Sequence, residues 1–190
     1  PVGPIFDLKK LDWLNGMHIR ALELDDFTSR LLPYLEADGI LSGNPSLGEL
    51  GRLREVAALI QTRIAHLTEA GALVAPFFAP DDMVDVADDA RAQLGEDAVR
   101  VLDAASTALQ ALPDEHSGVL ASESTWTAPA IEAALRAAVI DGLGLKPKVA
   151  FTPLRTAVSG RRISPPLFES MEILGKTATL TRLDALRSTL

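Results

Sequence analysis

The side chains best suited to bind a ligand lie in a basic stretch near the end of the chain, KPKVAFTPLRTAVSGRRISPPLFES, residues 146–170. Ammonium and guanidinium groups bind phosphate oxygens, and a guanidinium can also donate two parallel hydrogen bonds to a base edge. Arg155 is expected in a proline-shaped loop, and Pro165 and Leu167 add apolar surface on which an unpaired base can pack. This chemistry fits single-stranded RNA. The pattern alone favours a plainer structure, in which Arg155 caps a helix end and Ser164 begins a helix.

A second arginine, Arg63, stands in an apolar pattern. The apolar residues recur at helical spacing: Leu53, Val56, Ala57, Ile60, Ile64 and Leu67. They predict one helix from the cap residue Ser46 to about Gly71, with Arg63 at the border of its apolar stripe. The Arg63 side chain either lays its methylenes on the core with its head in water, or is held there to bind a ligand.

Groupings of residues that could support catalysis or metal binding do not occur in the sequence. The chain has no cysteine, and its three histidines, His18, His66 and His116, are far apart. It has no Gly-rich phosphate loop after a predicted strand and no Ser-His-Asp arrangement. Adjacent carboxylates such as Asp88 and Asp89 are best explained as a solvated helix face. The sequence therefore predicts no active site and no metal site, and favours binding as the function.

Charge is distributed unevenly along the 190 residues. The whole chain has a net charge of −8, but residues 146–190 hold eight basic and three acidic side chains, a net charge of +5. The remaining residues therefore carry −13, with an acidic run at residues 81–97. A polyanion is expected to be attracted to the last quarter of the chain and repelled by much of the rest.

Almost every segment is predicted to be helical, because Ala and Leu are abundant and apolar residues recur three and four positions apart. We expect an all-α protein of two consecutive helical subdomains, residues 1–112 and 126–190. The polar residues 113–125, which include Gly and Pro, are expected to link the two subdomains.

Three segments carry a family resemblance: FDLKKLDWLNGMHIR (residues 6–20), WTAPAIEAALRAAVIDGLGL (126–145) and PLRTAVSGRRISPPLFESMEILGKTATLTRL (153–183). They are similar, in this order, to segments of the bacterial class I glutamyl-tRNA synthetases. The resemblance covers essentially the whole chain and is weakest between about residues 72 and 123. It implies the carboxy-terminal anticodon-binding region, an anticodon-binding helical bundle, without the catalytic domain, whose HIGH- and KMSK-type motifs do not occur here.

The resemblance implies roles for five residues. Arg63 matches the arginine that reads the third anticodon base, and Arg155 matches the arginine associated with the first base. Ser164, Pro165 and Leu167 match the stretch that packs against the anticodon bases. A stiff helical scaffold is expected to display both guanidiniums toward the same unpaired trinucleotide. Retention of Arg63 predicts an enzyme that discriminates glutamate tRNA from glutamine tRNA.

Further basic residues are expected to contact the tRNA backbone: Lys9, Lys10, Arg20, Lys146, Lys148, Arg161 and Arg162. For the first three, the resemblance implies a place near the inner corner of the tRNA, whereas lysines that are merely solvated are the structural alternative. The apolar residues beside them, Trp13, Leu14 and Ile19, are expected to be core, in a helix that Asp7 can cap.

Taken over the whole chain, the resemblance implies a part of a glutamate–tRNA ligase, which joins glutamate to tRNA(Glu) with ATP and Mg²⁺ in the parent enzyme. The fragment alone is expected to be catalytically inactive and to hold no cofactor or metal, and its opening proline fits a fragment. The expected partners are tRNA(Glu) and the catalytic domain of the same chain, in a cytoplasmic monomer that does not contact a membrane. The alternative is a helical protein-interaction module whose basic segment docks an acidic partner; preferential binding of glutamate tRNA at matched salt distinguishes the two.

Overall fold

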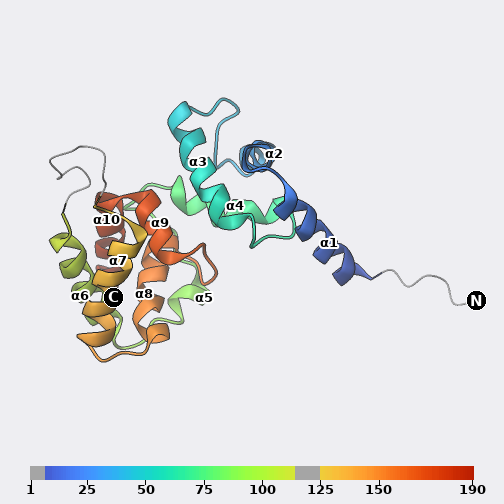
Figure 1. Ribbon diagram of the computed structural model, residues 1–190. Helices are drawn as coiled ribbons and strands as arrows, with labels where there is room; N and C mark the ends of the chain where they lie inside the picture. The colour runs from blue at the N-terminus through green and yellow to red at the C-terminus, as the bar shows by residue number, and fades with distance from the viewer. Residues whose placement is uncertain (1–6, 114–124) are drawn as a thin grey trace, which may run out of the picture. The chain divides into compact units, whose positions relative to one another are not determined.

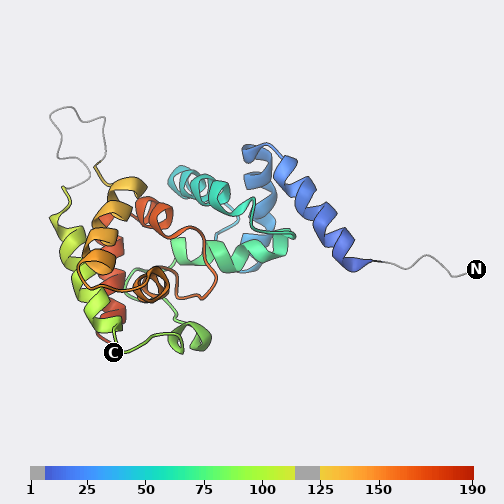
Figure 2. The same ribbon diagram turned by 60° about the horizontal axis from the view of Figure 1, so that its bottom comes forward.

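The computed structural model describes residues 7–113 and 125–190, and every regular element in these ranges is a helix, with no strand in either range (Figures 1 and 2). The all-α class predicted from the sequence is therefore confirmed. Contacts between residues divide the chain into two compact units, residues 1–78 and 79–190.

The first unit is built around three helices that pack on one another, α2, α3 and α4 (Figure 1). Their apolar faces meet in a core to which Phe27, Leu31, Leu53 and Ile60 contribute fully buried side chains. The elements of this unit are α1 (Leu8–Ala21), α2 (Leu24–Ala37), α3 (Leu47–Ile60), the 3-10 helix η1 (Leu67–Glu69), α4 (Ala70–Val74) and the 3-10 helix η2 (Ala75–Phe77).

Two helix starts in this unit follow the sequence signals. The Asp7 side chain accepts a hydrogen bond from the backbone nitrogen of Lys10 and caps α1. Ser46 and Glu49 form a reciprocal capping box at the start of α3. The hydrogen bonds from Ser46 lower the pKa of the Glu49 carboxyl, because they stabilise its charged form.

Helix α3 is shorter than expected: it ends at Ile60 instead of near Gly71. The Gln61 side-chain amide donates to the carbonyl oxygens of Ile19 (3.0 Å) and Leu22 (2.8 Å), at the end of α1. The Ile19 carbonyl also accepts from the Leu22 backbone nitrogen at 3.2 Å, so the Gln61 amide adds a second bond there and ties the end of α3 to the end of α1. Residues 61–63 therefore form a turn beside α1, and the expectation that Arg63 lies on a helix is wrong.

Helix α1 exposes most of its apolar side chains. Ile19 is buried, as expected, but the expectation of core positions for Trp13 and Leu14 is wrong, because they are 58% and 37% exposed. In the part of the chain that the structure describes, α1 is held to the rest of its unit mainly by polar groups. Asn15 donates to the Ala65 carbonyl, and Asp12 pairs with His66 at 3.0 Å.

The second unit is a bundle in which α6 and α8 both pack on α10, and α7 packs on α9 (Figures 1 and 2). The indole nitrogen of the buried Trp126 donates to the carbonyl of Met171 and ties α7 to α9. The elements are α5 (Asp88–Arg91), α6 (Ala98–Ala111), α7 (Ala128–Leu135), the π-helix η3 (Arg136–Asp141), α8 (Pro147–Ser159), α9 (Leu167–Leu174) and α10 (Lys176–Arg187).

The division between Phe78 and Ala79 differs from the link expected at residues 113–125, of which 114–124 lie outside the described residues. The difference arises because α6 buries Val101, Leu102 and Leu109 within the second unit, against α8 and α10. A polar stretch indicates contact with solvent, but it does not show which helices share a core.

Candidate nucleic-acid interface

Arg155 lies on α8, where the sequence predicted a proline-shaped loop. The first residue of this helix, Pro147, occupies a position where the missing N–H costs no hydrogen bond. Pro153 lies inside the helix and lacks one helical donor, and its buried ring packs within the second unit. Arg155 is half-buried, and its Nη1 atom donates to Ser164 Oγ at 2.7 Å and to the Pro165 carbonyl at 3.2 Å. Arg155 is thus anchored to the loop before α9.

The three residues expected to pack against bases are brought together with Arg155, but all three are largely buried. Ser164 is 8% exposed, Leu167 is 5% exposed, and Pro165 is also buried. Helix α9 begins at Leu167, so Ser164 does not cap it; its hydroxyl binds Arg155 instead. Ile163, which the sequence interpretation passed over, is 77% exposed beside this cluster.

A pocket of about 680 Å³ runs along α8 on the turns that precede Arg155. Its size lies in the usual range for small-ligand sites. Two of the predicted backbone-contact residues, Lys148 and Arg162, line it, and the charged group of neither side chain has a hydrogen-bond or ion-pair partner among the described residues. Val149, Thr152 and Pro153 form the α8 wall, and residues 93 and 95–98 form the opposite one. The pocket therefore combines two cations and apolar surface with two carboxylates, Glu96 and Asp97, of which Asp97 is paired with Arg100.

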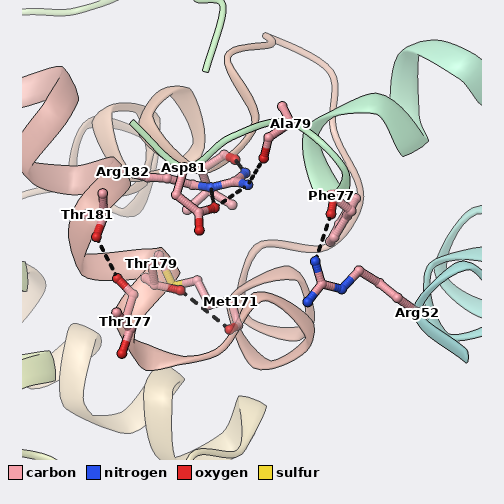
Figure 3. Close-up of polar contacts among 10 residues, drawn as sticks. Arg52, Phe77, Ala79, Asp81, Met171, Thr177, Thr179, Thr181 and Arg182 are labelled. Atoms are coloured by element: carbon pink, nitrogen blue, oxygen red, sulfur yellow. Dashed lines mark hydrogen bonds and ion pairs between the residues drawn. The ribbon is translucent and has the colours of Figure 1, made fainter. Parts of the chain in front are cut away.

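The other basic residues of the second unit behave differently from one another. Lys146 is exposed and has no partner among the described side chains, as expected for a phosphate contact. Arg161, in contrast, pairs with Asp85 (Nη2 to Oδ2, 3.0 Å). Arg182 is 1% exposed and pairs with Asp81 at 2.7 Å (Figure 3).

Pairing with distant carboxylates reduces the excess positive charge that the sequence assigns to residues 146–190. Asp81, Asp85 and Asp103, all from the acidic part of the chain, pair with three of the eight basic residues, Arg182, Arg161 and Arg187. The positive charge that faces solvent without a partner among the described residues is thus concentrated on Lys146, Lys148 and Arg162, at the two ends of α8.

Arg63 lies in the turn after α3 and is exposed. Its backbone nitrogen donates to the Ile60 carbonyl at 2.8 Å, and no described residue binds its guanidinium. The turn itself is fixed on both sides, by Gln61 on the carbonyls of α1 and by Asn15 on Ala65. The rigidity expected from a helical stripe is therefore supplied by side-chain amides.

The three basic residues predicted at α1, Lys9, Lys10 and Arg20, are all exposed. The described residues offer no ion-pair partner to any of them. Their contact with the tRNA backbone stays a prediction.

The described residues contain no cluster of three or more histidine or carboxylate side chains that could hold a metal ion. Among the described helices, none combines the length and the apolar composition that a membrane crossing requires.

The all-α fold, with an anchored arginine and unpartnered cations at the two ends of α8, is the arrangement expected of a helical binding module. Residues 26–187 match the model of the anticodon binding domain, and the chain belongs to this family. It is 50% identical over 184 residues to a glutamate–tRNA ligase of Acidothermus cellulolyticus and 50% identical over 182 residues to one of Arthrobacter sp.. In each case the match covers 96% of this chain but 34% of the relative, so the chain spans about a third of the length of these relatives.

The fold is also found in a solved structure. The crystal structure of a glutamate tRNA ligase from Elizabethkingia meningosepticum matches with a TM-score of 0.74 at 16% identity, covering 97% of this chain and 33% of that one. The predicted resemblance to glutamyl-tRNA synthetases is confirmed by the sequence relatives, and the solved structure supports the fold.

Proposed function

We propose that this chain is the anticodon-recognising part of a glutamate–tRNA ligase and that it binds tRNA(Glu). The observation that carries the proposal is the 50% identity over 96% of the chain to such ligases, together with the family match. The parent enzyme would join glutamate to the tRNA with ATP and Mg²⁺ in a catalytic domain of the same polypeptide. We expect this chain alone to bind without catalysing, as a monomer in the cytoplasm; the family match does not favour a protein-interaction module.

In this proposal the second unit reads the first anticodon base. Lys146, Lys148 and Arg162 attract and hold phosphates of the anticodon loop. The anchored guanidinium of Arg155 then binds the edge of an unpaired base, while the pocket along α8 accommodates a neighbouring nucleotide. Because the anchor already restricts the Arg155 side chain, binding a base costs less conformational entropy.

Measured binding of the 190-residue chain to tRNA(Glu) tests the proposal directly. Filter binding at matched salt should show preference for tRNA(Glu) over a tRNA with an unrelated anticodon. Equal affinity for both would contradict anticodon recognition, and stronger binding to an acidic protein than to either tRNA would favour the protein-interaction module.

The first unit is proposed to read the third anticodon base through Arg63. A guanidinium carries only donors, which suit the O2 and N3 acceptors of cytosine. Replacing Arg63 with glutamine should reduce the preference for glutamate tRNA over glutamine tRNA by about tenfold, the value of one well-placed pair of hydrogen bonds. The preference is measured as the ratio of the two dissociation constants.

Arg54→Gln is the matched control for Arg63→Gln. Arg54 is an exposed arginine on α3, and it already pairs with Asp25. The control should leave the ratio unchanged. An unchanged ratio in Arg63→Gln as well would remove Arg63 from the reading of the third base.

A further inference from the structure

The orientation of Arg155 depends on the loop between α8 and α9, because Ser164 and Pro165 in that loop accept its hydrogen bonds. The loop begins at Gly160, which closes α8 in the left-handed region with φ of 64°. Any displacement of residues 160–165 therefore moves the anchor of Arg155.

Residues 79–87, which we call the strap, hold the end of α8 from the amino-terminal side of the second unit. The buried Arg182 of α10 binds Asp81 through Nε at 2.8 Å and the Ala79 carbonyl through Nη2 at 3.4 Å (Figure 3). Its Nη1 atom donates to the Val158 carbonyl in the last turn of α8 at 2.8 Å. One guanidinium thus joins the start of the strap to α8.

The far end of the strap binds the loop itself. Arg161 donates from Nη1 to the Asp85 carbonyl at 2.7 Å and pairs through Nη2 with the Asp85 carboxylate at 3.0 Å. The Ala87 nitrogen donates to the Gly160 carbonyl at 2.9 Å. The two backbones lie so close that a β-carbon on Gly160 would overlap the Asp85 carbonyl oxygen.

We propose that Asp85 and Arg161 are positioning residues for anticodon reading: they fix the loop that anchors Arg155, and Arg161 does not contact the tRNA backbone. The proposal rests on the proposed function. Asp85 is 82% and Arg161 36% exposed, so their ion pair adds little to the stability of the fold. Its effect is instead on the local conformation of residues 160–165, and it replaces the phosphate contact expected of Arg161 from the sequence.

A double-mutant cycle on the 190-residue chain distinguishes a positioning role of Arg161 from a phosphate contact. The two roles predict opposite changes in tRNA affinity for Asp85→Ala: weaker binding if the pair positions the loop, and tighter binding if the substitution frees Arg161 to contact a phosphate. If Arg161 positions the loop, Asp85→Ala and Arg161→Ala should each weaken binding of tRNA(Glu) by about threefold to tenfold, and the double variant should be no weaker than either. The preference for the native first anticodon base should fall in parallel. The dependence of affinity on salt should keep its slope, since no phosphate contact is lost.

Asp82→Ala is the matched control for Asp85→Ala. Asp82 is an exposed carboxylate of the same strap without a hydrogen-bond or ion-pair partner among the described residues, so its removal changes the net charge equally. We expect Asp82→Ala to bind tRNA(Glu) as well as the unaltered chain or slightly better. Arg161→Lys keeps the charge but not the forked geometry, and should not restore affinity.

Three results would overturn this proposal alone. Tighter binding by Asp85→Ala, or a salt slope reduced by about one in Arg161→Ala, would make Arg161 a phosphate contact. An equal loss of affinity for native and altered anticodons, accompanied by a lower melting temperature, would make the pair merely structural. In each case a loss of first-base preference in Arg155→Ala would leave the proposed function intact. Absence of any anticodon-dependent binding by the unaltered chain would overturn both.

Discussion

Replacing Arg182 with methionine should lower the free energy of unfolding by about 3 kcal/mol, near the lower end of the range for breaking a buried ion pair. The side chain is 1% exposed and binds Asp81, the Ala79 carbonyl and the Val158 carbonyl, so methionine fills the volume but leaves these oxygens without their donor. The lower end applies because Asp81 is 41% exposed and can be hydrated after the substitution.

Thermal and urea unfolding, followed by circular dichroism, measure this effect. A loss of about 3 kcal/mol corresponds to a melting temperature lower by about 10 °C for a unit of this size. Arg187→Met is the matched control, because Arg187 lies on the same helix and pairs with Asp103 at the surface, where both side chains are about half exposed. Arg187→Met should have the same melting temperature as the unaltered chain. Equal melting temperatures for the two variants would show that burial of Arg182 adds nothing to stability.

Arg182 also shows which part of the structure could not be predicted from the sequence. Its carboxylate partner lies 101 residues away, and that of Arg161 lies 76 residues away. Summing charges over residues 146–190 counts both arginines as available to a polyanion, although each is paired within the folded second unit. A charge sum describes the chain, whereas attraction to RNA depends on the charges left exposed after folding.

Local signals predicted local structure well. The caps at Asp7 and Ser46 were predicted from the sequence, and both side chains accept hydrogen bonds from a backbone nitrogen three residues ahead. Helix α8 was missed because its two prolines favour a loop in any local pattern, although one lies in the first turn and burial of the other compensates its missing donor.

Arg155 and Ser164, which the resemblance assigned to the anticodon site in separate roles, lie together in the structure. Their hydrogen bond was not predicted, because no short-range pattern relates a helix interior to the loop after it, and their roles in anticodon binding stay predictions. The burial of Leu167 depends on packing between α8 and α9, which apolar periodicity alone does not give. Whether Arg63 and Arg155 face the same trinucleotide stays a prediction.

Replacing Arg155 with alanine should reduce the preference for the native first anticodon base by about tenfold to a hundredfold, the range for a lost bidentate contact. Arg155→Lys separates the reading of a base from charge attraction. Lysine keeps the positive charge, and therefore the salt dependence, but lacks the planar fork that binds a base edge and the Ser164–Pro165 anchor together. Both variants should therefore lose preference, while only the alanine variant should also lose electrostatic attraction.

The measurement compares dissociation constants for tRNA(Glu) and for the same tRNA with its first anticodon base replaced, at two salt concentrations. Arg187→Met again serves as the control, because it removes an arginine of the same unit whose charge is already paired. If Arg155→Ala weakened binding of both tRNAs by the same factor, Arg155 would act as a general cation or as a support for the loop. A selective loss for the native base, shared by the lysine variant, requires a directional contact, because charge alone does not distinguish one base from another.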